Sequence, residues 1–257
     1  MRVKDQLGRE LHIKARPERI ISLVPSQTEL LVVLGVGNRL VGVTKFCVHP
    51  EHIRKTTAVV GGTKAVHMDK IAALRPDLII ANKEENTLEM VEELSQLAPV
   101  WVSDVISVSD QLDLVTQLGE ILQLQTAAHS LNKSTNEALA QLKHQLRGLP
   151  KERVVYLIWK KPYMAAGRDT FINTMIELCG WENMIEEMRY PELSTAQMSR
   201  ADRILLSTEP YPFKQADLEE LAKATARPVQ LVDGEFFSWY GSRFPKALSY
   251  LADLRQS

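Results

Sequence analysis

The sequence of 257 residues has little of several things that would narrow its class at once. It has only two cysteines, and its 31 Lys and Arg residues nearly balance its 32 Asp and Glu residues, for a formal net charge of −1. A disulfide-dense scaffold and an overall basic field that attracts nucleic acid or anionic lipid are therefore both excluded.

Long apolar stretches are also missing. A membrane-spanning helix needs about 20 mostly apolar residues, and the apolar run at 20–24 near the start is far shorter. Residues 1–5 lack the apolar core of a secretory signal. We therefore expect no membrane span, and a cytoplasmic protein if Met1 is the native start.

What is present is an ordinary globular composition, with 45% hydrophobic and 25% charged residues. A chain of this length can bury a sizeable core and predicts one large domain or two lobes. Cys47 and Cys179 lie far apart and belong to no CxxC pair. Two buried free thiols are the simpler interpretation, and a disulfide stays open.

Short apolar runs alternate with helical patterns at close spacing along both ends of the chain. Predicted strands cover 19–24, 39–44, 77–81, 100–102, 153–159, 203–207 and 228–232, and predicted helices cover 68–75, 86–97, 169–179, 214–224 and 242–254, with one more after Pro25. After that proline, Ser26 and Glu29 have the spacing of a capping box. This alternation predicts an α/β fold with parallel-type sheets.

The middle of the chain differs in texture. From 109 to 146 there is no proline and a single glycine, and apolar residues recur at helical spacing. We expect one long helix, or two nearly collinear helices with a break near Leu124, reaching roughly 50 Å at about 1.5 Å per residue. The predicted organisation is therefore an N-terminal lobe (1–106), a connecting backbone helix (107–148) and a C-terminal lobe (149–257).

The two ends of the chain also echo each other. A strand and helix ending in Gly35-Val-Gly-Asn in the first half match a strand and helix ending in Gly180-Trp-Glu-Asn in the second. The segment 76–80 matches 201–205 in the same way. Two similar three-layer lobes would enclose a cleft, and ligands of open parallel sheets lie beyond the carboxyl ends of the strands.

Several loops after predicted strands carry candidate binding residues. Four aromatic residues crowd into 236–240, and we expect Trp239 or Tyr240 to line the cleft, the alternative being an apolar plug under the last helix. Arg243 stands near a helix N-terminus, which disfavours a cation unless a carboxylate or a ligand offsets it. The further candidates from these loops are Lys83, Glu84, Trp159 and Tyr163.

Metal and enzyme signatures are weak. Cys47, His49 and His52 have thiolate and imidazole ligands that suit zinc or copper, but Pro50 interrupts the run and no fourth ligand is near. We interpret them as loop residues and predict no metal site. The sequence has no Gly-x-Ser-x-Gly, P-loop or His-Glu-x-x-His motif, so we do not predict an enzyme.

A family resemblance joins these features. The segments that carry it are 19–31 (RIISLVPSQTELL), 40–44 (LVGVT), Gly61-Gly62, 71–81 (IAALRPDLIIA) and 241–243 (GSR), in that order. Together they resemble the helical-backbone solute-binding proteins of ABC importers, a class III periplasmic-binding-protein type that carries vitamin B12, ferric siderophores or haem. The resemblance covers about 19–254 and is nearest to the cobalamin-binding type.

The resemblance implies a ligand site made by loops of both lobes. Its positions fall here on aromatic, thioether and polar residues, which suggest a pocket wetter than a corrinoid slot and, with nearby Lys and Arg, an anionic chelate. The predicted ligand-binding residues are Phe46, Lys83, Glu84, Trp159, Tyr163, Met164, Tyr190, Trp239, Tyr240 and Arg243. No covalently bound cofactor is expected.

The resemblance also implies docking to a permease through one acidic residue on each lobe. Asp69 keeps that charge and Ala196 loses it, which puts ordinary docking in doubt. The expected function is capture of cobalamin, a ferric siderophore or a related metal chelate for an ABC importer, by a monomer that is periplasmic if a signal has been removed. The alternatives are an intracellular carrier or sensor of a metal cofactor and, less favoured, an enzyme that handles one.

Overall fold

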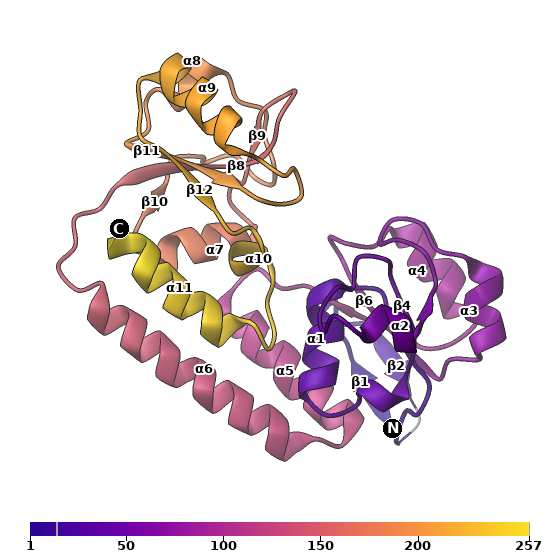
Figure 1. Cartoon of the computed structure of the whole chain (residues 1–257). Coiled ribbons are helices and arrows are strands. Elements are labelled where there is room, and N and C mark those ends of the chain that lie inside the picture. The colour runs from indigo at the N-terminus through magenta and orange to yellow at the C-terminus, as the bar shows by residue number, and fades with distance from the viewer. Residues whose placement is uncertain (14, 257) are drawn as a thin grey trace. The chain divides into compact units, whose positions relative to one another are not determined.

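The structure, a computed structural model, describes residues 1–13 and 15–256. The chain divides into two compact units. Figure 1 shows it coloured by residue number from the N-terminus to the C-terminus. Unit 1 comprises Met1–Thr135 and a short later segment, Tyr240–Arg243. Unit 2 comprises Asn136–Trp239 and the chain from Phe244 onward. No helix of the described residues is both long enough and apolar enough to cross a membrane.

Unit 1 is built on a parallel sheet of five strands in the order β5-β4-β3-β6-β7. The strands are β3 (Ile20–Ser22), β4 (Leu40–Val43), β5 (Ala58–Val59), β6 (Leu78–Asn82) and β7 (Val100–Ser103). Strands β3, β6 and β7 are buried along their whole length, because helices cover both faces of a parallel sheet and such strands become continuous apolar runs. This sheet confirms the strands predicted for the first half.

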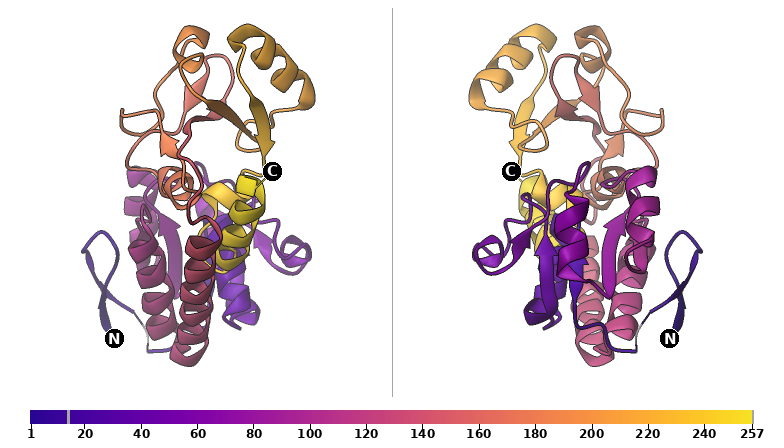
Figure 2. Two further views of the ribbon diagram at one scale, coloured as in Figure 1. Left: turned by 90° about the vertical axis from the view of Figure 1, so that its left-hand side faces the viewer. Right: turned by 90° about the vertical axis from the view of Figure 1, so that its right-hand side faces the viewer.

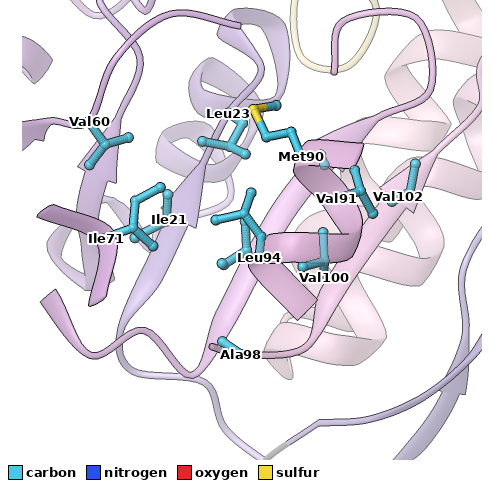
Figure 3. Close-up of a cluster of buried hydrophobic side chains, with 12 residues drawn as sticks. Ile21, Leu23, Val60, Ile71, Met90, Val91, Leu94, Ala98, Val100 and Val102 are labelled. Atoms are coloured by element: carbon cyan, nitrogen blue, oxygen red, sulfur yellow. The ribbon is translucent and has the colours of Figure 1, made fainter. Parts of the chain in front are cut away.

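Helices α1 (Pro25–Val33), α2 (Ile53–Thr56), α3 (Met68–Leu74) and α4 (Leu88–Ser95) and the turn η1 (Gly37–Arg39) connect these strands. Figure 3 shows the apolar residues Met90, Val91 and Leu94 of α4 on the same side of the sheet as Leu23, which follows β3, and Val100 of β7. Thr87 caps α4 by accepting from the N–H of Met90 at 3.2 Å.

The start of α1 corrects one prediction. The helix begins at Pro25 with Val24 as its N-cap, and no side chain caps it. Proline suits the first helical position because its fixed φ is helical and its missing N–H would have had no partner there. The expected capping box of Ser26 and Glu29 is therefore wrong, and Glu29 pairs with Arg243 instead.

A small antiparallel ribbon of β1 (Arg2–Lys4) and β2 (Glu10–His12) precedes the sheet and was not predicted. Asp5 joins it to unit 1, because its buried carboxylate binds the Arg9 side chain at 2.7 Å and accepts from the N–H of Val102 at 3.3 Å. Three-residue strands with mixed burial have too short an apolar pattern to be found in the sequence.

Unit 2 is built on a second sheet, in the order β10-β8-β11-β12, with β9 antiparallel to β8. Its strands are β8 (Arg153–Trp159), β9 (Met164–Ala165), β10 (Glu182–Asn183), β11 (Arg203–Ser207) and β12 (Val229–Val232). Its helices are α7 (Phe171–Leu178), α8 (Thr195–Met198), α9 (Gln215–Thr225), α10 (Glu235–Ser238) and α11 (Phe244–Gln256). Val155, Leu157 and Leu206 from the strands pack with Leu221 of α9 in a fully buried core.

The two sheets confirm the echo between the halves of the sequence. Strands β3, β4, β6 and β7 correspond in order to β8, β10, β11 and β12. The matching aspartates do the same work in each unit: Asp77 accepts from the N–H of Arg19 at 2.8 Å, and Asp202 accepts from the N–H of Arg153, also at 2.8 Å. Asp77 thus fixes the start of β3 against the start of β6, and Asp202 fixes the start of β8 against the start of β11.

The middle of the chain corrects a second prediction. Helices α5 (Val108–Leu122) and α6 (Gln125–Gln145) are neither one helix nor collinear, but an antiparallel hairpin, visible in Figures 1 and 2. Asn132 of α6 reaches back to α5 and donates to the carbonyl of Leu112 at 2.9 Å. Gln123 makes the turn in the left-handed region, at φ 60°, without the glycine that would have marked it.

Helix α6 is the long element shared by the two units. Its 21 residues begin in unit 1 and end in unit 2. At about 1.5 Å per residue its length is roughly 32 Å, shorter than a single helix over the whole middle segment would be. The backbone helix of the predicted fold is therefore α6 alone, and α5 belongs to unit 1.

Candidate functional site

In unit 1, polar side chains gather where β3, β6 and β7 end. Gln27, in the first turn of α1, is fully buried and donates to the hydroxyl groups of Ser103 and Tyr240, the latter at 3.1 Å. The other end of its amide, Oε1, has no hydrogen-bond partner in the structure. These contacts form a buried, neutral hydrogen-bond network at the carboxyl end of the sheet, the edge where ligands of α/β folds bind.

Asn82, the last residue of β6, shapes the loop that follows it. Its side-chain oxygen accepts from the backbone N–H of Glu84 at 2.8 Å and of Glu85 at 3.1 Å, and its amide donates to Ser103. The side chain of Asn86 in turn accepts from the N–H of Asn82 at 2.8 Å. This local bonding orders the loop that carries the predicted residues Lys83 and Glu84.

The predicted residues Phe46 and Lys83 both stand at this end of unit 1. Phe46 has 49% of its surface exposed, and the Lys45 ammonium lies 5.0 Å from its ring centroid. Lys83 forms an ion pair with Asp104 at 2.6 Å. Glu84 is half-buried, and its carbonyl accepts from the Lys64 ammonium.

Tyr240 and Arg243 belong to unit 1 although the chain around them belongs to unit 2. Burial raises the pKa of the Tyr240 hydroxyl well above its ordinary value, and the nearby Glu85 carboxylate adds to this. Arg243 makes two hydrogen bonds to Glu29, at 2.9 and 3.1 Å. Arg243 stands just before the N-terminus of α11, where a cation needs a carboxylate partner. Glu29 of the protein itself supplies that carboxylate.

In unit 2, the most exposed predicted residue is Trp159, the last residue of β8. Its side chain leaves 41% of the residue's surface exposed, and its ring meets that of Tyr211 edge to face at 5.6 Å. Tyr211 is half-buried and packs in turn on the buried ring of Phe213 at 4.7 Å. A large part of Trp159 thus stays exposed at the carboxyl end of the sheet.

Two further predicted residues lie on the hairpin that follows, and a third, Tyr190, lies on a later segment beside it. Met164 in β9 is paired with Trp159 across the two strands, which brings their side chains close. The carbonyl of Tyr163 accepts from the N–H of Leu193 at 2.9 Å, and Arg189 lies 5.6 Å from the ring centroid of Tyr190. The structure thus brings Trp159 and Met164 together and places Tyr163 and Tyr190 on the segments that flank them.

Lys160, next to Trp159, does not contribute a cation to this surface. It is largely buried in ion pairs with Asp217 and Glu220, both at 2.7 Å, and these two hydrogen bonds raise its pKa. Together with the Arg243–Glu29 pair, this leaves two of the basic groups near the predicted site neutralised within their own units. The expected surplus of Lys and Arg for an anionic ligand is weaker than the sequence indicates.

Trp239 is anchored in unit 2 by a buried carboxylate. Its indole N–H donates to Glu209 at 3.0 Å, and the Ser238 hydroxyl donates to the same oxygen at 2.6 Å. Burial raises the pKa of Glu209, and Glu235 and Asp233 raise it further. Only 8% of Trp239 is exposed. Its indole therefore holds this loop in place and offers little of its surface to a ligand.

We expect Glu209→Gln to raise the melting temperature at neutral pH. Because burial raises its pKa, the folded protein binds this proton more readily than the unfolded chain, and the resulting stability is lost as pH rises through the raised pKa. Glutamine is neutral at every pH and can still accept from Trp239. Melting curves of both proteins between about pH 4 and pH 8 should show a gap that is largest at pH 8 and closes toward pH 4; a constant gap would contradict the assignment.

Cys47, weighed above as a possible metal ligand, lies in the interior of unit 1. Its sulfur lies buried between the hydroxyls of Thr28 at 3.1 Å and Thr44 at 3.2 Å, and burial raises its pKa. Within the described part of the chain, no three His, Cys, Asp or Glu side chains are placed to hold a metal ion. Cys47 and Cys179 are both free and buried, which confirms the simpler of the two interpretations.

Comparison with known proteins identifies the fold and the family. A family model described as a periplasmic binding protein matches residues 20–225, most of the chain. The chain belongs to the periplasmic binding protein family. A periplasmic vitamin B12-binding protein of Vibrio cholerae shares its fold at a TM-score of 0.79, with 23% identity and coverage of 94% of this chain and 98% of the other. A periplasmic heme-binding protein from Pseudomonas aeruginosa does so at 0.81, with 20% identity and coverage of 93% and 92%.

Two curated relatives of this periplasmic binding protein are informative. An uncharacterized ABC transporter substrate-binding lipoprotein of Bacillus subtilis is 27% identical over 203 residues, which cover 72% of this chain and 64% of that protein. The match therefore spans less than two thirds of that relative's length. A vitamin B12-binding protein of Pectobacterium carotovorum is 26% identical over 235 residues, which cover 89% and 85%.

The predicted docking positions of this binding protein are equivalent in the two units. Asp69 is the second residue of α3 and Ala196 the second residue of α8, and these helices precede the corresponding strands β6 and β11. Both residues are exposed. The structure therefore presents a carboxylate on unit 1 and a methyl group at the same place on unit 2.

Four residues at the strand ends of this binding protein were not predicted as site residues: Gln27, Ser103, Glu209 and Tyr211. Gln27, Ser103 and Glu209 each lie within three residues of the end of a predicted buried strand, and that position is the signal that could have found them. Tyr211 lies slightly further along, and its contact with Trp159, which is distant in sequence, could not be found from that position.

Proposed function

We propose that this chain is the solute-binding component of an ABC importer and captures a metal-bearing, cofactor-like molecule with a broad apolar face. The observation that carries this proposal is the open indole of Trp159, which Tyr211 supports from one side. An aromatic residue held rigidly at the carboxyl end of a parallel sheet offers a flat apolar surface at low cost in side-chain entropy.

The residues at the strand ends of unit 1 offer little positive charge to pair with ligand carboxylates. Gln27, Ser103 and Tyr240 are uncharged, buried and hydrogen-bonded to one another. Arg243 is already bound to Glu29, and Lys83 to Asp104. Of the relatives' ligands, vitamin B12 has an amide-rich edge and a broad corrin face, whereas haem carries two carboxylates. Within the proposed class, a corrinoid therefore fits these residues better than haem.

The same proposal includes export of the chain and its docking to a permease. The lipoprotein relative and the B12-binding relatives suggest that this chain acts outside the cytoplasm and delivers its ligand to a membrane partner. Asp69 would supply the ion pair on unit 1. At Ala196 the corresponding pair is lost, and this one observation favours the alternative of an intracellular carrier or sensor of a metal cofactor.

Thermal shift and titration calorimetry with cyanocobalamin, hemin and a ferric siderophore test the proposed ligand class. A probe at 100 times its Kd adds about 2.7 kcal/mol to stability, which corresponds to roughly 5–10 °C in Tm for a chain of this size. We expect cyanocobalamin to give the largest shift. The absence of any shift with all three probes would reject the ligand class, and fractionation of cells that express the gene from its native start would separate importer from intracellular carrier.

A further inference from the structure

Lys160 is the first residue of the loop that joins β8 to β9, directly after Trp159. Its ammonium binds two carboxylates of α9, those of Asp217 and Glu220, each at 2.7 Å, and only 10% of its side chain is exposed. Most lysines keep their ammonium in water, so a lysine covered to this extent is uncommon. The cation beside the most exposed predicted residue is therefore used for contacts within unit 2.

Asp217 connects this ammonium to the start of α9. One of its carboxylate oxygens accepts from Lys160, and the other accepts from the N–H of Lys214, the N-cap of the helix, at 2.9 Å. The segment that leads into Lys214 carries Tyr211, whose ring meets that of Trp159 edge to face. Lys160 thus binds the helix that directly follows the Tyr211 segment.

A backbone hydrogen bond joins the same two segments next to the rings. The N–H of Tyr211 donates to the carbonyl of Ile158, the residue before Trp159, at 3.3 Å. Both chain neighbours of Trp159 are therefore fixed, Ile158 to the Tyr211 segment and Lys160 to the helix after it. Because 41% of Trp159 is exposed, packing constrains its ring less than it would a buried ring, and these contacts set where the indole starts from.

The ion pairs of Lys160 are better suited to fixing geometry than to adding stability. Replacing covered ion pairs by apolar residues is often neutral or stabilising, so such pairs contribute little net stability to a fold. Two carboxylates on one helix do, however, define where a shared ammonium lies. They thereby define the path of the chain at the residue that follows Trp159.

We propose that Lys160 is a positioning residue for ligand binding: its two ion pairs to α9 hold Trp159 beside Tyr211, with the indole in the orientation that meets the ligand. This inference rests on the proposed function, in which Trp159 lines the ligand site. A side chain that is already ordered in the free protein loses less conformational entropy when the ligand covers it, and the affinity rises accordingly.

Fluorine NMR of the ligand-free protein tests the positioning directly. The chain has four tryptophans, so labelling with 5-fluorotryptophan gives four resonances, and Trp159→Phe assigns that of Trp159. Lys160→Met removes the ammonium and keeps an unbranched apolar side chain. It should shift the Trp159 resonance by more than its linewidth or broaden it at least twofold, while the buried Trp101 and Trp181 keep their positions. Lys160→Arg keeps the charge and should retain the parent resonance.

Titration calorimetry with cyanocobalamin, or with hemin or the ferric siderophore if only that probe binds, measures the effect on affinity. Lys160→Met should weaken binding by about two- to tenfold, the cost of ordering one side chain on binding. Lys160→Arg should restore the parent affinity. If Lys160→Met does not fold, Glu220→Gln removes one of the two ion pairs at a carboxylate that is 59% exposed, and it should change the Trp159 resonance in the same direction.

Arg203→Met is the matched control. It breaks an ion pair with Glu152 at 3.1 Å at the start of β11, the amino end of the same sheet, and it should leave the Trp159 resonance and the affinity unchanged.

Three results would overturn the positioning role of Lys160. They are a parent-like Trp159 resonance in the variant that folds, a changed resonance with unchanged affinity, and an equal change of the resonance in Arg203→Met. A parent protein that binds none of the three probes would instead reject the proposed function. The two failures are distinct, because the fluorine measurement uses no ligand.

Discussion

Replacing Trp159 by alanine should weaken binding of whichever probe binds best by more than tenfold, with only a small change in melting temperature. Covering the open face of a large aromatic residue contributes about 1.5–3 kcal/mol, which corresponds to a factor of ten to more than a hundred in Kd. The loss of stability should be small, because 41% of the residue is already exposed and its ring makes an edge-to-face contact with the half-buried Tyr211. Titration calorimetry and melting curves measure the two effects separately.

Two other variants show whether the effect on binding is specific. Leu97→Ala removes an apolar residue that is 40% exposed between α4 and the start of β7, at the amino end of the sheet, and should leave the affinity unchanged. Trp239→Ala should weaken binding by more than tenfold but also lower stability, because it removes a buried side chain and a donor to Glu209. An unchanged affinity in Trp159→Ala would remove this residue from the site and the main support from the proposed function.

Introducing leucine at Gly119 should cost about 3 kcal/mol of unfolding free energy, at the upper end of what overpacking usually costs. Gly119 lies where α5 meets α6, and a Cβ at this position would be 2.4 Å from the Cβ of Ala128. Neither atom is the end of a flexible side chain, so the two helices must move apart. Urea unfolding followed by circular dichroism measures the loss, and the midpoint should fall with little change in slope.

The same hairpin offers controls for this prediction. Ala140→Leu adds a similar volume on the exposed face of α6 and should change stability by less than about 0.5 kcal/mol. Exchanging the two residues, as Gly119→Ala with Ala128→Gly, should recover stability relative to Gly119→Ala alone, because the pair keeps its summed size. A loss of under 0.5 kcal/mol in Gly119→Leu would mean that the helices are not packed at this contact.

Local sequence patterns were enough to predict most strands and the repeat. Strands β8 and β11 begin and end at the predicted residues, because apolar runs bounded by polar residues fix them. The correspondence between Asp77 and Asp202 could be found from the sequence. Both carboxylates accept a backbone N–H at the start of a neighbouring strand, and this interaction requires the same residue type in each half.

Features that depend on distant partners could not be predicted in the same way. The turn at Gln123 has no glycine or proline, so helical periodicity ran on through it and suggested collinear helices. The bond of Arg243 to Glu29 joins residues more than 200 positions apart, and only its electrostatic need for a carboxylate was visible. Likewise, the anchoring of Trp239 on Glu209 depends on a loop whose conformation no local pattern fixes.

The contacts of Tyr240–Arg243 with unit 1 have a consequence for how the chain is made. Synthesis proceeds from the N-terminus, so Gln27 and Glu29 emerge from the ribosome long before Tyr240 and Arg243, which bind them. Unit 1 can bury its sheet early, but its polar groups at the strand ends meet Tyr240–Arg243 only when 243 of the 257 residues have been added. The hydrogen bonds of unit 1 are therefore complete only after most of unit 2 has been made.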